Sequence, residues 1–432
     1  MKRLFSGGVH PDGRKELTSG EKPAIMKAPP YVVLPMQQHI GAPCLPLVQV
    51  GDLVTVGQKI GDGDGMCVPV HASVSGRVVA VEPRPHSKGG NVLAVVIEND
   101  GLNTPANGIF DPKAESMTRQ ELLSTIREAG IVGMGGAAFP TYIKADVKTG
   151  AIDTLIINGC ECEPYLTADD ALMRGWPEDV VKGVQLLAKV LAPKKSILAV
   201  EDNKPEAIVA VRKAAEQTDV QIRVLPTRYP QGAEKQLIFA VTGREVPPGK
   251  LPKDVGCAVC NVATAAAVYR AVCMGVPAVS RIVSVTGEGV CSPGNYIVPI
   301  GTPISHVLEA AGGLTQDVQK VIAGGPMMGV ALSDLEAPVG KGTGSILCLK
   351  AAPAVRGTAC IRCGKCLQAC PMRLQPLYLY RNEACGNLQE LEQLHLMDCI
   401  ECGCCSYVCP GKLPLVERVR AGKRALKERK TT

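Results

Sequence analysis

The segment TRQELLSTIREAGIVGMGGAAFPTYIK, residues 118–144, marks the point at which short strands give way to an alternation of helices and strands. Its first half predicts a helix with Thr118 as the N-cap, Glu121 three residues later and Gly130 as the stop. Helical segments and apolar strands then alternate over residues 152–159, 178–191, 195–202, 204–217 and 220–226. This alternation predicts an α/β domain with a mostly parallel sheet.

The composition differs on either side of this domain. Residues 31–105 read as short strands between glycine turns, as in VQVGDLVTVGQKIGDG, and resemble the barrel-sandwich of lipoyl and biotinyl carrier domains. Those domains carry a cofactor on a lysine at a hairpin tip, which is occupied here by Gly63, Asp64 and Gly65. We therefore expect the architecture without the carrier function. Residues 281–335 predict a strand, a turn, a second strand and a helix, a small β-grasp-like unit.

Two cysteine runs near the carboxyl end repeat the spacing C-x2-C-x2-C-x3-C, each followed by proline. This is the spacing of bacterial two-cluster ferredoxins, in which the fourth cysteine of each run ligates the other cluster. The predicted ligands of cluster 1 are Cys360, Cys363, Cys366 and Cys409. The predicted ligands of cluster 2 are Cys399, Cys402, Cys405 and Cys370. A pair of zinc sites, the alternative, needs no third cysteine in a run and no crossed fourth one.

The remaining cysteines show no ligand spacing. The chain has 19 cysteines, and Cys44, Cys67 and Cys348 are among those expected to be small buried apolar residues. The six histidines, His39 included, are scattered and predict no metal set. No signal-peptide pattern opens the chain and no uncharged stretch predicts a transmembrane helix, so we expect a cytosolic or peripheral protein without disulfides.

The positive charge is confined to the carboxyl end. The chain carries a formal net charge of +6, and its last 22 residues hold eight basic and two acidic residues, so the rest is neutral. This distribution argues against a nucleic-acid surface, which spreads basic residues over a folded domain. Leu415, Val419, Gly422 and Leu426 form one weak helical stripe. The tail could pack on the cysteine-rich unit, lie on anionic lipid, meet an acidic partner or stay solvated.

The glycine loop GMGGAAFPTYIK, residues 133–144, indicates a nucleotide site. Glycine amides can approach a phosphate that Lys144 would neutralise. The strand at 152–159 then delivers Asn158, Glu161 and Glu163 at its carboxyl end, where ligands bind in open α/β sheets. A helix precedes the loop, so the loop departs from the G-x-G-x-x-G dinucleotide fingerprint.

Four motifs occur in the order found in the NADH-binding flavoprotein subunit of respiratory complex I: GMGGAAFPTYIK, NGCECEP, YPQGAEKQL and CNVAT. The domain that follows them resembles that subunit's SLBB domain. The opening FSGGVHP, together with LPMQQHIGAPC and VHASVSGRVVAVEP, resembles the RnfC or RsxC family, which supplies one subunit of the Rnf ion-translocating complex. The resemblance extends from Phe5 to about Pro414.

The resemblance implies a set of cofactor contacts, with no side chain acting as nucleophile or general acid. FMN would be lined by Gly133, Gly135, Gly136 and Ala137, with Lys144 at its phosphate. Asn158, Glu161, Asn261 and Thr264 would also hold the flavin. NAD(H) would meet Phe139, Glu163, Tyr229 and Glu234. Departures from the complex I pattern occur at Cys160, Ala233 and Cys260.

The resemblance also implies an activity. NADH carries two electrons as hydride and an iron–sulfur cluster carries one, so a flavin is needed between them. The implied protein is a peripheral subunit of an ion-translocating ferredoxin:NAD⁺ oxidoreductase on the cytoplasmic face of the membrane. Its partners would be the other Rnf subunits, with ferredoxin reached indirectly and Na⁺ or H⁺ moved. Two alternatives are a soluble NADH-dependent reductase, such as a microcompartment cobalamin reductase, and a non-catalytic relay subunit.

The resulting prediction is a multidomain α/β and α+β protein. Its expected parts are an extended segment (1–30), a barrel-sandwich hybrid domain (31–105), an FMN/NAD(H)-binding α/β domain (115–280), an SLBB domain (281–335), a linker (336–357), a two-cluster [4Fe–4S] domain (358–414) and a basic tail (415–432).

Overall fold

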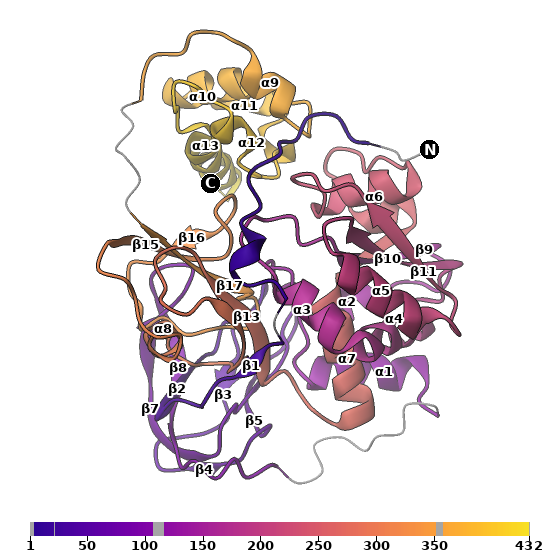
Figure 1. The fold of residues 1–432 in the computed structure, drawn as a ribbon, viewed down its shortest axis with the longest axis vertical. Helices are drawn as coiled ribbons and strands as arrows, with labels where there is room; N and C mark the ends of the chain where they lie inside the picture. The colour runs from indigo at the N-terminus through magenta and orange to yellow at the C-terminus, as the bar shows by residue number, and fades with distance from the viewer. Residues whose placement is uncertain (1–3, 21, 107–115, 351–356, 432) are drawn as a thin grey trace.

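A computed structural model of the chain describes residues 4–20, 22–106, 116–350 and 357–431. In Figure 1 the α/β domain lies on the right, the barrel and the SLBB domain lie on the left, and a small helical unit holding both cysteine runs lies at the top. Each predicted module is therefore present. The first residue of the expected α/β domain and most of the last part of the expected linker fall outside the described residues.

The α/β domain is built on a four-stranded parallel sheet of order β11-β10-β9-β12, which confirms the predicted fold class. Its strands are β9 (Thr154–Gly159), β10 (Lys195–Glu201), β11 (Val220–Leu225) and β12 (Cys257–Asn261). Its helices are α1 (Arg119–Glu128), α2 (Thr141–Ala145), α3 (Ala168–Gly175), α4 (Pro177–Leu191), α5 (Pro205–Ala215), α6 (Glu234–Thr242), the 3₁₀ helix η2 (Pro252–Val255) and α7 (Val262–Met274). Helix α1 begins at the predicted capping box of Thr118 and Glu121.

The core of this domain is aliphatic, because the chain has only four phenylalanines and one tryptophan. Small residues let its helices approach closely. A Cβ atom added to Gly183 in α4 would lie 1.9 Å from the Ala265 carbonyl oxygen in α7, so the two helices meet backbone to backbone at this point. The apolar core continues without a break from this domain into the barrel.

The barrel is made of two antiparallel sheets, of order β2-β8-β7-β4 and β3-β5-β6. Its strands are β2 (Tyr31–Pro35), β3 (Leu45–Pro46), β4 (Leu53–Val54), β5 (Lys59–Asp62), β6 (Val70–His71), β7 (Gly76–Pro85) and β8 (Asn91–Asn99). Side chains from both sheets, Val32, Ile60 and Ile97 among them, share one core, as in a barrel-sandwich.

The SLBB domain contains a six-stranded mixed sheet of order β1-β14-β13-β17-β15-β16. Its elements are β1 (Ala24–Ile25), β13 (Ser280–Thr286), β14 (Gly294–Pro299), α8 (Ile304–Ala310), β15 (Val318–Ala323), β16 (Val330–Ala331) and β17 (Ser345–Lys350). The structure differs from the predicted linker over residues 336–357, because β17 pairs with both β13 and β15 inside the sheet. The amino-terminal segment also joins this sheet, through β1, and forms the 3₁₀ helix η1 (Lys15–Leu17) before it.

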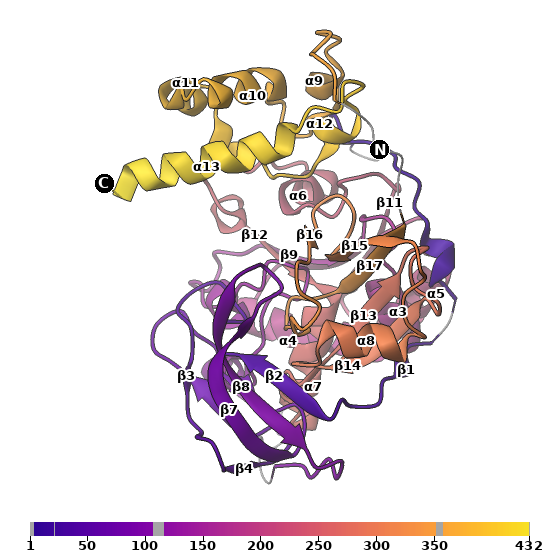
Figure 2. The ribbon, with the colours of Figure 1, turned by 90° about the vertical axis from the view of Figure 1, so that its left-hand side faces the viewer.

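The cysteine runs lie in a unit of short helices. Its elements are α9 (Lys365–Ala369), α10 (Pro376–Ala384), α11 (Leu388–Gln393), the 3₁₀ helix η3 (Leu396–Asp398), α12 (Cys404–Tyr407) and α13 (Leu415–Thr431). Figure 2 shows α13 running along α10 and α11. The predicted stripe is buried there, with Leu415, Val419 and Leu426 at most 2% exposed. The basic tail therefore packs on the cysteine-rich unit.

Among the residues that the structure describes, no helix combines the length and the apolar composition needed to cross a bilayer.

We expect Gly183→Ala to destabilise the α/β domain by about 1–3 kcal/mol, because the added methyl group overpacks the α4–α7 contact. Urea unfolding followed by Trp176 fluorescence measures this effect, since the single tryptophan directly precedes α4. The matched control is Gly175→Ala, where a Cβ atom would meet nothing within 4 Å. Equal midpoints for the two variants would contradict the prediction.

Candidate functional site

The glycine loop is a closed turn between α1 and α2. The Gly133 amide donates to the Phe139 carbonyl at 2.8 Å, so the loop folds back on itself. Gly135, Gly136 and Ala137 are exposed at its tip. Gly136 has a φ of 108°, which favours glycine, and a Cβ atom there would meet nothing within 4 Å. The tip thus presents backbone to open space.

The loop lies beside the amino end of α7. The Met134 amide donates to the Thr264 hydroxyl at 2.9 Å, and a Cβ atom on Gly135 would lie 3.4 Å from Asn261 Cβ. Asn261 is the N-cap of α7 and accepts from the Ala263 amide at 2.8 Å. A helix amino terminus and an exposed glycine turn both favour a bound anion. The residues predicted to hold the flavin phosphate side therefore fit that group.

The structure brings Lys144 and Glu234 together from α2 and α6. Lys144 Nζ donates to the Val259 carbonyl at 2.9 Å and lies 3.3 Å from a carboxylate oxygen of Glu234. The two side chains are 35% and 42% exposed, so a ligand can reach both. Phe139 is partly exposed at the end of the glycine loop.

The carboxyl ends of β9 and β12 carry the next pair of predicted residues, Asn158 and Asn261, which lie in register. Asn158 Nδ2 donates to the Gly232 carbonyl at 2.8 Å. Asn261 Nδ2 donates to Asp169 Oδ2 at 2.7 Å. Both amides are thus oriented by neighbours at the sheet edge predicted to bind the ligand.

Glu161 caps α3 instead of extending toward the glycine loop. Its carboxylate accepts from the amides of Asp169 at 2.8 Å and Asp170 at 3.2 Å, and its own φ is 47°. Burial raises the pKa of the Glu161 carboxyl to about 7, against the opposing charge of Lys15. Lys15 Nζ donates to the carbonyls of Glu161, at 2.9 Å, and Glu163, at 3.0 Å. The amino-terminal segment therefore ties down the loop after β9.

Glu163 points toward the SLBB domain. Its Oε2 atom accepts from the Met327 amide at 3.1 Å, whereas its Oε1 atom is buried without a hydrogen-bond partner. Burial raises the pKa of the Glu163 carboxyl to about 7, although backbone amides of the 325–329 turn lower it. In this arrangement Glu163 joins two domains, whereas the resemblance implied a contact with NADH.

Tyr229 joins the α/β domain to the cysteine-rich unit. It is 2% exposed, and its hydroxyl donates to the Cys402 carbonyl at 2.7 Å. Val9 pairs with Tyr229 through two backbone hydrogen bonds, of 2.8 and 3.0 Å. The structure thus places Tyr229 against a predicted cluster ligand, whereas the resemblance implied a place beside the nicotinamide.

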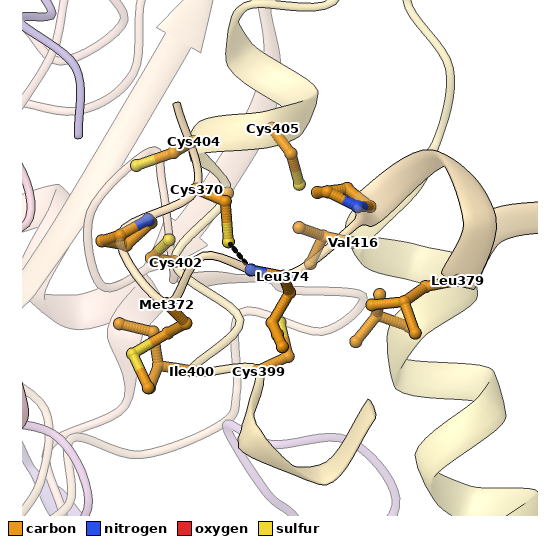
Figure 3. A pocket seen from close by; sticks show the side chains of 14 residues that line it. Cys370, Met372, Leu374, Leu379, Cys399, Ile400, Cys402, Cys404, Cys405 and Val416 are labelled. Carbon is orange, nitrogen blue, oxygen red and sulfur yellow. Dashed lines mark hydrogen bonds between the residues drawn. The ribbon is translucent and has the colours of Figure 1, made fainter. Parts of the chain in front are cut away.

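Cysteines from both runs meet around one pocket (Figure 3). The thiols that line it include all four ligands predicted for cluster 2: Cys370, Cys399, Cys402 and Cys405. The other walls are apolar, with Leu374 and Val416 among them. Four converging thiols with no carboxylate beside them are a donor set suited to an iron–sulfur cluster. Cys404 also lines this pocket.

The two runs have the same backbone conformation, 39 residues apart. Positive φ angles recur at Arg362 and Glu401, both at 56°, and at Gly364 and Gly403, at 74° and 78°. The Arg362 amide donates to Cys360 Sγ at 3.3 Å, and the Glu401 amide donates to Cys399 Sγ at 3.4 Å. Each run thus builds the same amide-lined turn around its first sulfur.

The ligands predicted for cluster 1 lie on the outer side of the unit. Cys360 and Cys363 are exposed, whereas Cys366 and Cys409 pack beside Cys405 on an apolar cluster that includes Leu415. The structure therefore brings the fourth cysteine of the second run to the side of the first run, as the crossed spacing predicts.

Sequence reasoning missed two charged residues at this edge. Asp169 holds Asn261, and the buried Arg281 donates from Nη2 to the Met134 carbonyl at 3.0 Å. Burial lowers the pKa of Arg281 to about 10, against the opposing effect of Asp169. A signal existed for Arg281, which is the single charged residue in the apolar strand β13. Nothing in the sequence indicated the role of Lys15.

We expect Glu163→Gln to raise the melting temperature by roughly 2–4 °C at pH 8 and to leave it unchanged at pH 5. The unfolded carboxyl ionises near 4.5 and the folded one near 7, so the unfolded state binds fewer protons between these values and wild-type stability falls as the pH rises. Glutamine mimics the protonated acid and removes this loss. Thermal unfolding at the two pH values measures it, and an equal shift at both would refute the assignment.

Four family matches cover the chain in the order of its domains. The RnfC barrel-sandwich hybrid domain matches residues 3–102, and the Nuo51 FMN-binding domain matches residues 126–270. The SLBB domain matches residues 282–331, and the 4Fe-4S dicluster domain matches residues 353–410.

Solved structures with a similar fold include chains of an NAD⁺-reducing [NiFe]-hydrogenase. The air-oxidised form aligns with a TM-score of 0.52 and 20% identity over 75% of this chain and 69% of that chain. The H₂-reduced form aligns with a TM-score of 0.52 and 22% identity over 76% and 65%. At these identities the likeness concerns the fold alone.

Curated relatives match nearly the whole chain. The RnfC-type subunit of the Na(+)-translocating ferredoxin:NAD(+) oxidoreductase complex from Acetobacterium woodii is 46% identical over 98% of this chain and 97% of the relative. The proton-translocating counterpart from Clostridium ljungdahlii is 46% identical over 88% and 84%. The RnfC-type subunit of the ion-translocating oxidoreductase complex from Rhodobacter capsulatus is 43% identical over 98% and 83%. The chain therefore belongs to the RnfC family, whose members are subunits of ion-translocating oxidoreductase complexes.

Proposed function

We propose that this chain is the subunit of an ion-translocating ferredoxin:NAD⁺ oxidoreductase complex that carries electrons between NAD(H) and its partner subunits through FMN and two [4Fe–4S] clusters. The observation that carries the proposal is the contact of Tyr229 with Cys402, because it seats a pocket of four cysteines directly on the flavin-type α/β domain. The other subunits of the complex are its partners.

FMN lies on the glycine loop in this proposal. The exposed amides of Gly135 and Gly136 and the amino end of α7 hold its phosphate, and Lys144 adds a positive charge. When bound, FMN takes two electrons from NADH and passes them on singly. The chain's own residues bind and orient the two nucleotides, and no side chain is required to exchange a proton.

NAD(H) approaches from the side on which Phe139 and Glu234 are accessible. A carboxylate at this place suits ribose hydroxyls and disfavours a 2′-phosphate, so we infer a preference for NADH over NADPH. Glu163 and Tyr229, whose polar atoms already bond to Met327 and Cys402, act by positioning the loop after β9 and the cysteine-rich unit.

The path from flavin to cluster crosses an apolar contact between domains. Cys162, Met327 and Tyr229 pack with Val9 and Cys402 in one hydrophobic cluster. Such a contact excludes water between the flavin domain and cluster 2. In this proposal cluster 2 therefore exchanges electrons with FMN, cluster 1 exchanges them with a partner subunit, and the protein sits on the cytoplasmic face of the membrane.

Anaerobic titration of the reconstituted protein with NADH tests the function. We expect bleaching of the flavin and cluster absorbance and EPR signals from reduced clusters. Lys144→Ala should weaken FMN binding about tenfold or more, because a charge-assisted contact to phosphate is lost. The control Lys148→Ala, at an exposed lysine four residues on, should bind FMN normally. Clusters that dithionite reduces but NADH does not, with FMN present, would contradict the proposal.

Paired cysteine variants test the cluster ligands. If the runs cross as predicted, Cys370→Ala and Cys399→Ala remove ligands of the same cluster, and the double variant should keep about four of about eight irons per chain. Cys370→Ala with Cys409→Ala should lose both clusters, and Cys404→Ala should lose neither. Iron analysis and EPR distinguish these outcomes. Reversed results for the two double variants would show that each run binds its own cluster.

A further inference from the structure

Three side chains without a role in electron transfer meet inside the barrel. His39 follows β2, Cys44 precedes β3 and Cys67 precedes β6, so three separate loops bring them together. All three are at most 4% exposed. The two sulfur atoms lie 3.3 Å apart, and His39 Nε2 lies 4.0 Å from Cys44 Sγ and 3.7 Å from Cys67 Sγ. Their potential ligand atoms all lie within 4.8 Å of one another.

These separations match one face of a metal coordination sphere. Three atoms spaced in this way lie about 2.1 Å from a common point in their plane, and a point slightly above the plane reaches the length of a zinc–sulfur bond, about 2.3 Å. Two buried sulfurs packed only for their apolar character have no need of a ring nitrogen at the third corner.

The histidine is oriented as metal-binding histidines are. Its Nδ1 atom lies 3.3 Å from the Ile40 carbonyl oxygen, so the ring can donate there and present the Nε2 lone pair to the thiols. That lone pair accepts from the Val68 amide at 3.3 Å, a contact that a metal ion would replace. The Val68 carbonyl oxygen, 3.2 Å from Cys44 Sγ, is in position to act as a fourth ligand.

We propose that His39, Cys44 and Cys67 bind one Zn²⁺ ion. Two sulfurs and one imidazole nitrogen form the mixed set that zinc prefers, and a fully buried site suits a structural ion without redox chemistry. Binding converts both thiols to thiolates and releases their two protons to solvent.

A positive charge beside the site favours the thiolates. Lys341 is 1% exposed, and its ammonium group donates to the carbonyls of Pro69, at 2.6 Å, and Gly130, at 2.8 Å. Its electrostatic partners include both Cys44 and Cys67. Two thiolates around Zn²⁺ leave the site neutral, so this lysine would meet no added positive charge.

The position of the site gives the ion a structural task. The Ile40 amide donates to the Ala138 carbonyl of the glycine loop at 3.1 Å, and Val68 packs on Val132 and Ala138. Zinc would therefore hold the barrel against the loop proposed to bind FMN. Loss of the ion should loosen this loop while leaving the cysteine-rich unit intact.

The test is metal analysis of the full chain, expressed with zinc in the medium and reconstituted with iron and sulfide. We expect about one zinc beside about eight irons per chain. Zinc K-edge X-ray absorption should show two sulfur neighbours at about 2.3 Å and nitrogen or oxygen neighbours at about 2.0–2.1 Å. The double variant Cys44→Ala with Cys67→Ala should lose the zinc and keep the iron.

Cys348→Ala is the matched control, because Cys348 is equally buried but belongs to the SLBB core. It should retain zinc. If the double variant does not fold, the wild-type absorption spectrum and His39→Gln decide the matter. Iron-replete wild type with less than about 0.1 zinc per chain, a zinc shell of four sulfurs, or a Cys44–Cys67 disulfide found by mass spectrometry would each overturn the proposal.

Discussion

The hydrogen bond from Tyr229 to the Cys402 carbonyl is the contact on which the rest of the electron path depends. Electron transfer between protein-bound centres requires proximity, and this bond joins the domain with the flavin-type loop to a cluster ligand. The amino-terminal segment reinforces it. Val9 pairs with Tyr229, and a Cβ atom on Gly7 would lie 2.5 Å from the Cys370 carbonyl oxygen, so only glycine lets the segment pass between the two parts.

Much of this arrangement could be predicted from local sequence signals. The capping box at Thr118, the parallel sheet and the crossed cysteine spacing each depend on residues close together in the chain. What could not be predicted depends on long-range pairing. Strand β17 follows a glycine- and proline-rich stretch that resembles a linker, and its partners β13 and β15 supply the edges that make it a strand. The stripe of α13 likewise indicated a helix face but not what covers it.

The residue roles implied by the resemblance divide in a similar way. Gly135, Gly136, Lys144 and Asn261 lie together around the glycine loop, because a shared sheet edge brings their elements together. The carboxylates after β9 differ, because their partners come from other domains: Lys15 reaches Glu161, and Met327 reaches Glu163. A motif indicates which residues recur at a site, whereas the partner that neutralises each charge is set by tertiary structure.

The glycine loop is consequently a junction as well as a binding element. Arg281 of the SLBB domain donates to the Met134 carbonyl, Ile40 of the barrel donates to Ala138, and Thr264 of α7 accepts from the Met134 amide. A loop rich in glycine has a large conformational entropy to lose on folding. Contacts from three directions remove that entropy before any ligand arrives, so a bound phosphate meets amides already in place. The neighbouring domains thereby pre-organise the flavin site without touching the reacting atoms.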